Sequence, residues 1–209
     1  MDNFSDYNSN QSQYDFGAAK KSRTRRFLEF IWEMTKITLI SLIIILPIRY
    51  FLIQPFYVKG ASMEPNFYDH EYLIIDEISY RFSEPKRGDI VVFKYPRDPR
   101  QFFIKRIIGL PGETLKIENG LVYITAGEVT NVLSEEYLQS NTETRLPISG
   151  YSETILKNDE YFLLGDNRDQ SLDSRIFGPV KRDFIIGRTW LRGWPFNRLT
   201  LFNTPKYEF

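Results

Sequence analysis

The sequence predicts a mainly β protein, in which one N-terminal transmembrane helix is followed by an antiparallel β domain. A strongly apolar run, Ile37–Ile48, lies downstream of a basic cluster and indicates the helix. Short runs of aromatic and β-branched residues recur through the rest of the chain, which is typical of strands. No long amphipathic helical pattern follows the apolar run, so we expect strands to build the domain.

The first 26 residues are predicted to form a disordered, basic tail. Residues 1–17 are rich in Asn, Asp, Ser and Gln and carry few aliphatic side chains, a composition that does not support a core. Five cations follow: Lys20, Lys21, Arg23, Arg25 and Arg26. Because positive charge beside a membrane span favours the cytoplasmic side, we expect residues 1–26 in the cytoplasm and the remaining domain across the membrane.

Residues 27–53 are the predicted transmembrane anchor. A span needs about 20 residues. The apolar run reaches that length as Ile31–Ile53 if Lys36 and Arg49 extend toward opposite interfaces. A cleavable signal peptide is one alternative, but the bulky residues 49–53 offer no small-x-small cleavage site. A buried helix of a soluble protein is another, and it leaves the five upstream cations unexplained.

Residues 54–209 are the predicted β-rich domain. Seven runs have strand character: Tyr72–Ile78, Asp89–Tyr95, Phe102–Ile108, Thr114–Ile117, Leu121–Thr125, Tyr161–Leu164 and Arg188–Leu191. Asn119-Gly120 separates two of them and predicts a type I′ hairpin turn. The formal charges of the chain cancel, so nothing indicates a nucleic-acid surface. The chain has no Cys/His metal cluster and no Gly-rich phosphate loop, and we expect neither a metal nor a cofactor.

Ser62 is the first candidate functional residue. It lies between the small pair Gly60-Ala61 and the turn-forming Pro65. Small neighbours let a substrate backbone approach and leave the serine amide free to donate a hydrogen bond to an oxyanion. An ordinary turn serine is the alternative interpretation, since serines are common in turns.

Lys105 is the second candidate, in the expected strand Phe102–Ile108. Alternation places Phe103, Lys105 and Ile107 on one face of that strand. An ammonium among apolar neighbours is desolvated, which lowers its pKa and lets the neutral amine accept a serine proton. An edge-strand lysine that discourages aggregation is the alternative. The chain has no cysteine and one histidine, His70, so a hydrolytic base is more readily a lysine than a histidine.

A third stretch, Gly165–Arg175, is rich in carboxylates, amides, hydroxyls and guanidinium groups. Such groups can form a closed polar network that fixes a loop. A calcium loop starting at Asn167 would need a glycine at Leu172 and an acid at Gly178, so calcium is not expected. A solvated polar loop is the other alternative, and the large apolar residues on both sides argue against it.

Taken in order, these stretches resemble the bacterial type I signal peptidases, which are membrane-anchored serine–lysine endopeptidases. The resemblance runs from about Ile37 to Trp194. Its elements are the apolar segment, Gln54-Pro55-Phe56, Ser62-Met63-Glu64-Pro65, Arg87-Gly88-Asp89 with its apolar continuation, Lys105-Arg106 through Pro111-Gly112, and Gly165-Asp166-Asn167-Arg168-Asp169. It implies a two-part antiparallel β catalytic domain. Residues 127–157 then resemble the family's variable insertion, away from the catalytic core.

The resemblance also implies a role for each matching residue. Ser62 matches the nucleophile, Lys105 the general base, and Ser171 the serine that orients the lysine amine. Asp166 with Arg106 and Asp173 with Arg175 match structural ion pairs. Residues that resemble the lining of the substrate pocket are Val58, Met63, Phe103 and Ile104.

Some positions depart from the family pattern. Gly60 stands where many members have a serine that completes the oxyanion hole, and Asn66-Phe67 replaces the usual Thr-Leu. If Phe67 faces the pocket, it changes the pocket's size and preference. Gln170 replaces a common asparagine and Phe177 a frequent tryptophan, and neither change removes a catalytic group.

The implied function is removal of N-terminal signal peptides from exported precursors by a single-pass enzyme of the bacterial cytoplasmic membrane. Its expected partners are signal-peptide-bearing precursors, the lipid bilayer and the secretion translocon. A self-cleaving repressor has a similar peptidase domain, but it would carry a DNA-binding helical domain in place of the apolar segment. The remaining alternatives are a non-catalytic membrane-anchored β module of the secretion pathway and a peptidase restricted to few substrates.

Overall fold

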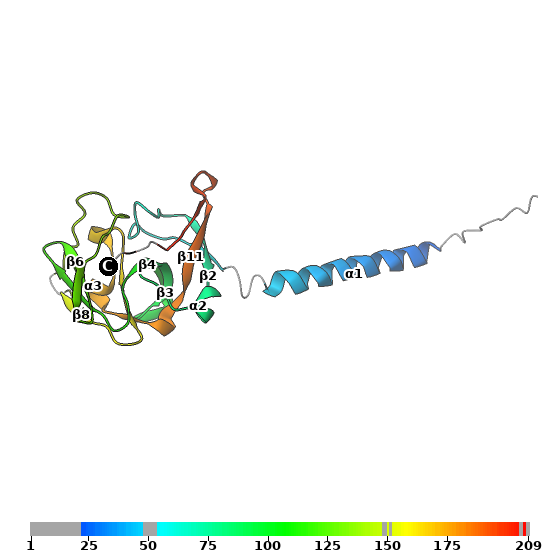
Figure 1. The fold of residues 1–209 in the computed structure, drawn as a ribbon. Helices are drawn as coiled ribbons and strands as arrows, with labels where there is room; N and C mark the ends of the chain where they lie inside the picture. Colours follow the sequence, from blue (N-terminus) through cyan, green and yellow to red (C-terminus); the bar gives the residue numbers. More distant parts are fainter. Residues whose placement is uncertain (1–21, 48–53, 148–149, 151, 205–206, 208–209) are drawn as a thin grey trace, which may run out of the picture. The chain divides into compact units, whose positions relative to one another are not determined.

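The computed structural model describes residues 22–47, 54–147, 150, 152–204 and 207 of the chain. These residues belong to two compact units, Met1–Ile45 and Leu46–Phe209, which are described separately (Figure 1).

Helix α1 spans Arg23–Pro47 and lies in the first unit except for its last two residues. Its 25 residues and a mean hydropathy of 1.7 over its most apolar window make it a candidate membrane span. None of its side chains is buried. The helix begins inside the basic segment that we expected to be disordered, and Arg25 pairs with Glu29 one turn later at 3.3 Å. The expected end of the anchor, residues 48–53, lies outside the described residues.

The second unit contains a large antiparallel sheet. Its strands are β1 Gln54–Tyr57, β2 Tyr72–Asp76, β3 Ile90–Tyr95, β4 Asp98–Gly109, β9 Glu160–Leu164, β10 Val180–Lys181, β11 Ile185–Trp194 and β12 Thr200–Leu201. They are ordered β1-β2-β11-β3-β4-β9-β10, and β12 pairs with β11. Neighbours that are distant in sequence, such as β2 and β11, therefore lie side by side (Figure 1).

A smaller antiparallel sheet follows β4 in the chain. It has the order β7-β6-β5-β8, formed by β5 Thr114–Glu118, β6 Leu121–Ala126, β7 Val129–Val132 and β8 Glu153–Ile155. Only short helices accompany the strands in the described part of this unit: α2 Ser79–Phe82, α3 Ser174–Phe177 and the 3₁₀ segments Arg168–Gln170, Arg182–Phe184 and Phe196–Arg198. The prediction of a mainly β, two-part antiparallel domain is confirmed.

All seven predicted strand runs coincide with strands, and the hairpin signal is confirmed. Asn119 and Gly120 have φ angles of 52° and 78°, the left-handed values that a type I′ turn requires. They connect β5 to β6 with Glu118 opposite Leu121. Five further strands were not predicted: β1, β7, β8, β10 and β12. They have two to four residues each, which is too short for a clear alternation of apolar and polar residues.

The alternating faces of β4 connect three apolar clusters. Ile107 packs in a cluster with Phe93, Leu163 and neighbouring residues, while Ile108 belongs to a cluster that includes the smaller sheet. Ile104 lies in the third cluster, with Val58, Met63, Phe67, Leu73, Ile75, Ile90 and Val92. Because each buried aliphatic side chain contributes about 1.5–3 kcal/mol, this packing fixes β4 firmly. The strand carrying Lys105 is therefore held from both faces.

Two glycines of β11 make a matched test of close packing between strands. A Cβ at Gly187 would stand 2.6 Å from the backbone oxygen of Asp76 and 2.8 Å from Ile75, whereas a Cβ at Gly193 would meet only the Tyr72 oxygen, at 3.9 Å. Gly187→Ala should therefore lower the free energy of unfolding by about 1–3 kcal/mol. Gly193→Ala should change it by no more than about 0.5 kcal/mol. Chemical unfolding of the full chain in detergent measures both, and equal losses would contradict the argument.

Candidate active site

Ser62 lies in a turn that packing holds in place. Gly60, with φ of +91°, adopts a backbone conformation that side chains disfavour, and its amide donates to Asp69 Oδ1 at 3.0 Å. On the other side of the serine, Met63 and Phe67 are buried in the third apolar cluster, and the Phe67 amide donates to the Met63 carbonyl at 2.9 Å. The serine itself is half-buried. Its turn is thus fixed at both ends.

The Lys105 side chain reaches this serine from β4. Its Nζ lies 2.7 Å from Ser62 Oγ and 2.8 Å from the Ile104 carbonyl oxygen, and the Phe103 ring centroid is 5.5 Å away. Lys105 is only 3% exposed. Burial lowers the pKa of the Lys105 amine from 10.5 to about 8, although the carboxylates of Asp173 and Asp166 oppose this shift. A substantial fraction of the amine is therefore neutral in mildly alkaline solution.

The loop after β9 holds the serine turn through backbone contacts. The Asn167 amide donates to the Ser62 carbonyl oxygen, and its side-chain Nδ2 donates to the Ala61 carbonyl oxygen, both at 3.1 Å. Gly165 is required for this close approach, because a Cβ there would stand 2.5 Å from the Ser62 oxygen and 2.2 Å from Ser171 Oγ. The Ser62 turn and the 165–175 stretch, more than a hundred residues apart, thus form one unit.

Ser171 is buried beside Gly165, and its hydroxyl has no hydrogen-bond partner among the described residues. No hydrogen bond joins it to Lys105 in this part of the chain. Because buried polar groups normally have partners, this hydroxyl is available as a donor or acceptor next to the Ser62–Lys105 pair.

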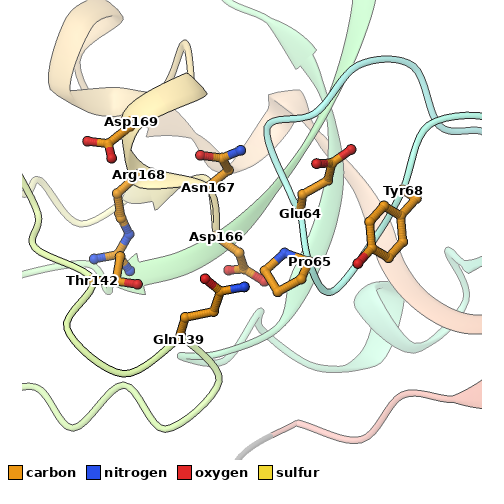
Figure 2. A pocket seen from close by; sticks show the side chains of 9 residues that line it. All are labelled: Glu64, Pro65, Tyr68, Gln139, Thr142, Asp166, Asn167, Arg168 and Asp169. Atoms are coloured by element: carbon orange, nitrogen blue, oxygen red, sulfur yellow. The ribbon is translucent and has the colours of Figure 1, made fainter.

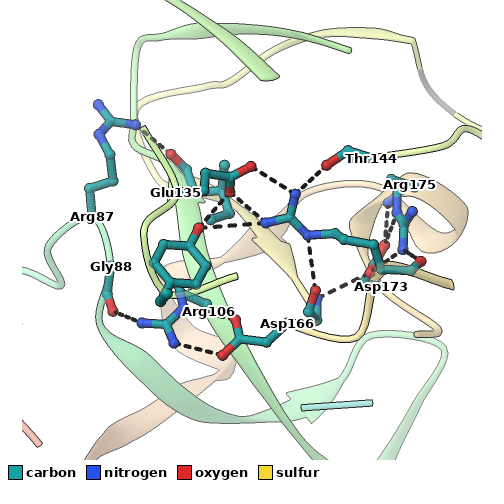
Figure 3. A network of polar contacts seen from close by, with 12 residues as sticks. Arg87, Gly88, Arg106, Glu135, Thr144, Asp166, Asp173 and Arg175 are labelled. Atoms are coloured by element: carbon teal, nitrogen blue, oxygen red, sulfur yellow. Dashed lines mark hydrogen bonds and ion pairs between the residues drawn. The ribbon is translucent and has the colours of Figure 1, made fainter. Parts of the chain in front are cut away.

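Two buried ion pairs fix the loop. Arg106 donates from Nε and Nη2 to the two carboxylate oxygens of Asp166, at 2.8 and 2.6 Å, and from Nη1 to the Gly88 carbonyl at 3.1 Å. Arg175 makes a similar two-pronged contact with Asp173, at 2.9 and 2.8 Å, as Figure 3 shows. All four side chains are nearly inaccessible to solvent. The structure thus brings together both pairs that the sequence resemblance indicated.

The segment 127–157 contacts this network, so our expectation that it lies away from the catalytic core is wrong. Glu135 forms an ion pair with Arg168 at 2.5 Å, and Thr144 accepts a hydrogen bond from the same guanidinium group (Figure 3). The ring of Tyr137 lies over the Arg106 guanidinium, with its centroid 3.8 Å from Cζ. Three side chains of this segment, those of Glu135, Tyr137 and Thr144, therefore contact buried arginines.

The residues proposed to line a substrate pocket divide into two groups. Val58, Met63, Phe67 and Ile104 pack together, and all four are buried. Phe67 has no exposed surface and stacks on Phe202 at 4.6 Å between ring centroids. Phe103 projects from the opposite face of β4 and stacks on the ring of Tyr95. In this structure the first group forms a closed apolar patch within the third apolar cluster, and its member Met63 is next to Ser62 in sequence.

A separate polar pocket of about 290 Å³ opens beside the turn (Figure 2). Its walls are Glu64, Pro65, Tyr68, Gln139, Thr142, Asp166, Asn167, Arg168 and Asp169. His70 is exposed, and its Nδ1 lies 2.9 Å from Asp69 Oδ2. Among the described residues, no group of three His, Asp or Glu side chains is placed to hold a metal ion.

Comparison with known proteins identifies the family. The family model for "Signal peptidase, peptidase S26" matches residues 31–194. A probable signal peptidase I-2 from Synechocystis sp. is 37% identical over 175 residues, covering 81% of this chain and 76% of that protein. Signal peptidase I from Leptolyngbya laminosa is 37% identical over 174 residues, covering 79% and 81%. A crystal structure of a signal peptidase I from Enterococcus faecalis V583 is 34% identical, covering 51% of this chain and 97% of that one, with a TM-score of 0.41.

The matched region contains the serine turn, β4 with its lysine and the loop after β9. The resemblance drawn from the sequence motifs is confirmed by a family model over most of the chain and by relatives that align over more than three quarters of their own length. The chain therefore belongs to the signal peptidases of peptidase family S26, and it is a serine endopeptidase.

Proposed function

We propose that this protein cleaves signal peptides from exported precursors, with Ser62 as the nucleophile and neutral Lys105 as the general base. The observation that carries the proposal is the 2.7 Å separation of Lys105 Nζ from Ser62 Oγ, with the lysine buried. That distance is within reach of direct proton transfer. A buried amine with a lowered pKa supplies an acceptor that an exposed lysine would not.

In the first step the amine takes the hydroxyl proton while Ser62 Oγ attacks the carbonyl carbon before the scissile bond. The charge that develops on the carbonyl oxygen needs a donor, and the Ser62 amide has no acceptor among the described residues. Collapse of the tetrahedral intermediate breaks the C–N bond, and the lysine returns its proton to the departing amine. The product is an acyl-enzyme and a free mature N-terminus.

Water then completes the reaction by the same route. Lys105 removes a proton from a water molecule, the resulting hydroxide attacks the ester, and Ser62 leaves with the proton that the lysine gives back. We propose that the unpaired Ser171 hydroxyl orients the amine through these transfers. The ion pairs of Arg106 with Asp166 and of Arg175 with Asp173 keep the loop rigid while they occur.

The membrane setting is also a proposal. Helix α1 is long and apolar enough to cross a bilayer, and basic residues precede and begin it. We propose a single-pass anchor with its N-terminus in the cytoplasm and the β domain outside, where precursors emerge from the secretion translocon. A bacterial cytoplasmic membrane then brings the lipid-embedded signal peptide and the enzyme together.

The proposed dyad predicts the behaviour of three variants. Ser62→Ala removes the proposed nucleophile, and Lys105→Ala leaves an unactivated serine, which is a poor nucleophile. Both variants should therefore abolish cleavage of a model precursor while leaving the fold intact. Lys105→Arg should not restore it, because arginine does not lose its proton. Lys116→Ala, which removes an exposed lysine of β5, is the matched control and should cleave normally. Cleavage by either Lys105 variant would place the base elsewhere.

The lowered pKa of Lys105 predicts the pH dependence of cleavage. The neutral amine is the active form, so its fraction and the single-turnover rate should rise with pH, with a midpoint near the pKa of about 8. A rate measured from neutral to alkaline pH checks this. An ascending limb near the ordinary lysine value of about 10.4 would contradict a buried base.

The proposed orientation predicts which part of the chain a protease reaches. Protease added outside spheroplasts should digest residues 62–209 and leave an epitope tag on the N-terminal tail intact. Lysed cells, in which both sides are accessible, provide the control. Protection of the β domain in intact spheroplasts would reverse the orientation.

The closed apolar patch predicts a preference for small residues before the scissile bond. Val58, Met63 and Ile104 leave little free space, so Ala, Ser or Gly should be accepted immediately before the cut and Leu or Phe rejected. Relative rates for a series with Ala, Ser, Gly, Val and Leu at that position test this. Efficient cleavage after Leu would show that the patch opens widely or lies elsewhere.

A further inference from the structure

Three segments of the proposed catalytic site meet at one residue of the insertion, Tyr137. Asn66, which follows the serine turn, donates from Nδ2 to the Tyr137 carbonyl oxygen at 3.0 Å and to Asp166 Oδ2 at 2.8 Å. Arg106, the residue after Lys105, lies under the Tyr137 ring. Asp166 of the loop after β9 accepts from both Asn66 and Arg106. Tyr137 thus touches the turn and the lysine strand and borders the loop.

The ring of Tyr137 completes the environment of Arg106. The guanidinium uses its edge to donate to Asp166 and to the Gly88 carbonyl, which leaves its flat face without a hydrogen-bonding partner. An aromatic ring 3.8 Å from Cζ covers that face with a cation–π contact and excludes water from the ion pair. A dry, two-pronged ion pair has one strongly preferred geometry. The ring therefore helps to hold Asp166 on Arg106.

Glu135 connects Tyr137 to the rest of the loop after β9. It accepts a hydrogen bond from the Tyr137 hydroxyl and forms an ion pair with Arg168, each at 2.5 Å. Arg168 in turn donates from Nε to the Gly165 carbonyl oxygen at 3.1 Å. Gly165 packs against the Ser62 carbonyl group. The path from Glu135 to Ser62 therefore consists of direct contacts between buried or half-buried groups.

We propose that Tyr137, supported by Glu135, is a positioning residue for this peptidase: it clamps Asn66, Arg106 and Asp166 so that Ser62 and Lys105 keep their separation. The inference rests on the Ser62–Lys105 dyad proposed above. It assigns the insertion a part in the reaction, although none of its described residues touches the reacting atoms. Asn66, a departure from the family pattern, supplies the contact between the serine turn and this clamp.

The clamp has a consequence for the charge around the lysine. Asp173 and Asp166 are the carboxylates that act on the Lys105 amine, and each is paired with its own arginine. Loss of the Tyr137 ring would admit water beside Arg106 and loosen its hold on Asp166. A less neutralised carboxylate and better solvation both favour the charged amine, so the pKa of Lys105 would rise. A purely structural role of Tyr137 would leave that pKa where it is.

The test compares variants of the full-length chain in detergent, with a model precursor as substrate and rates measured across pH. Tyr137→Leu should lower kcat by on the order of 10- to 100-fold with little change in KM, as expected for a misplaced dyad. The pH range over which the cleavage rate of this variant rises should move to higher pH. Tyr137→Phe, which keeps the ring, should retain most of the rate. Asn66→Ala should lower kcat in the same way, because it removes the contact between the serine turn and the clamp.

A matched pair of glutamates provides the control. Glu135→Gln weakens the ion pair with Arg168 and should lower kcat, whereas Glu136→Gln alters the exposed neighbouring side chain and should leave the kinetics unchanged. Thermal unfolding of each variant separates lost stability from lost positioning. If Tyr137→Leu fails to fold, Asn66→Ala and Glu135→Gln test the same clamp.

The inference is overturned if Tyr137→Leu keeps the wild-type kcat and the wild-type pH dependence of the rate. Where Tyr137→Leu does not fold, the same result for Asn66→Ala overturns it. It is also overturned if Tyr137→Phe loses as much rate as Tyr137→Leu, since the ring would then not be the active feature. Ser62→Ala and Lys105→Ala, assayed alongside, keep the two proposals separate. If they remain active, the dyad itself is wrong; if they are inactive and the clamp variants are normal, only the clamp is wrong.

Discussion

The burial of one amine is the constraint on which the rest of the site depends. As the proposed base, Lys105 has to remain neutral often enough to accept a proton, and it has to remain beside Ser62 while it does so. Desolvation meets the first requirement and the alternating packing of β4 meets the second. Both would fail in an open groove, where water would stabilise the ammonium and the long side chain would sample many rotamers.

The buried ion pairs around the lysine follow from the same constraint. Carboxylates near an amine favour its charged form, so Asp166 and Asp173 would work against the neutral base if they stood alone. Each is held in a two-pronged contact by an arginine, which offsets its charge and uses its oxygens for fixed hydrogen bonds. Buried pairs of this kind contribute little net stability, and their value here lies in geometry and in local charge balance.

Much of this arrangement could be predicted from the sequence, and the reasons are local. Alternation over Phe102–Ile108 revealed the strand and the face of Lys105, and Asn119-Gly120 revealed the hairpin, because both depend on neighbouring residues. The contacts of Glu135 and Tyr137 could not be predicted in this way. Apart from their contact with each other, their partners are 31 or more residues distant. A polar segment that contacts buried arginines also has the same composition as a solvated loop.

The buried lysine also makes the stability of the folded state depend on pH. In the unfolded chain the amine holds its proton up to a pKa near 10.5, whereas in the folded protein it releases it near 8. Between these values the unfolded chain binds more protons, so folding becomes more favourable as pH rises through that interval. Below it, the native protein carries the full penalty of a charged group in an apolar site, about 3 kcal/mol for a shift of this size. The residue proposed as the catalytic base thus makes the folded state less stable at neutral pH than an apolar side chain of the same length would.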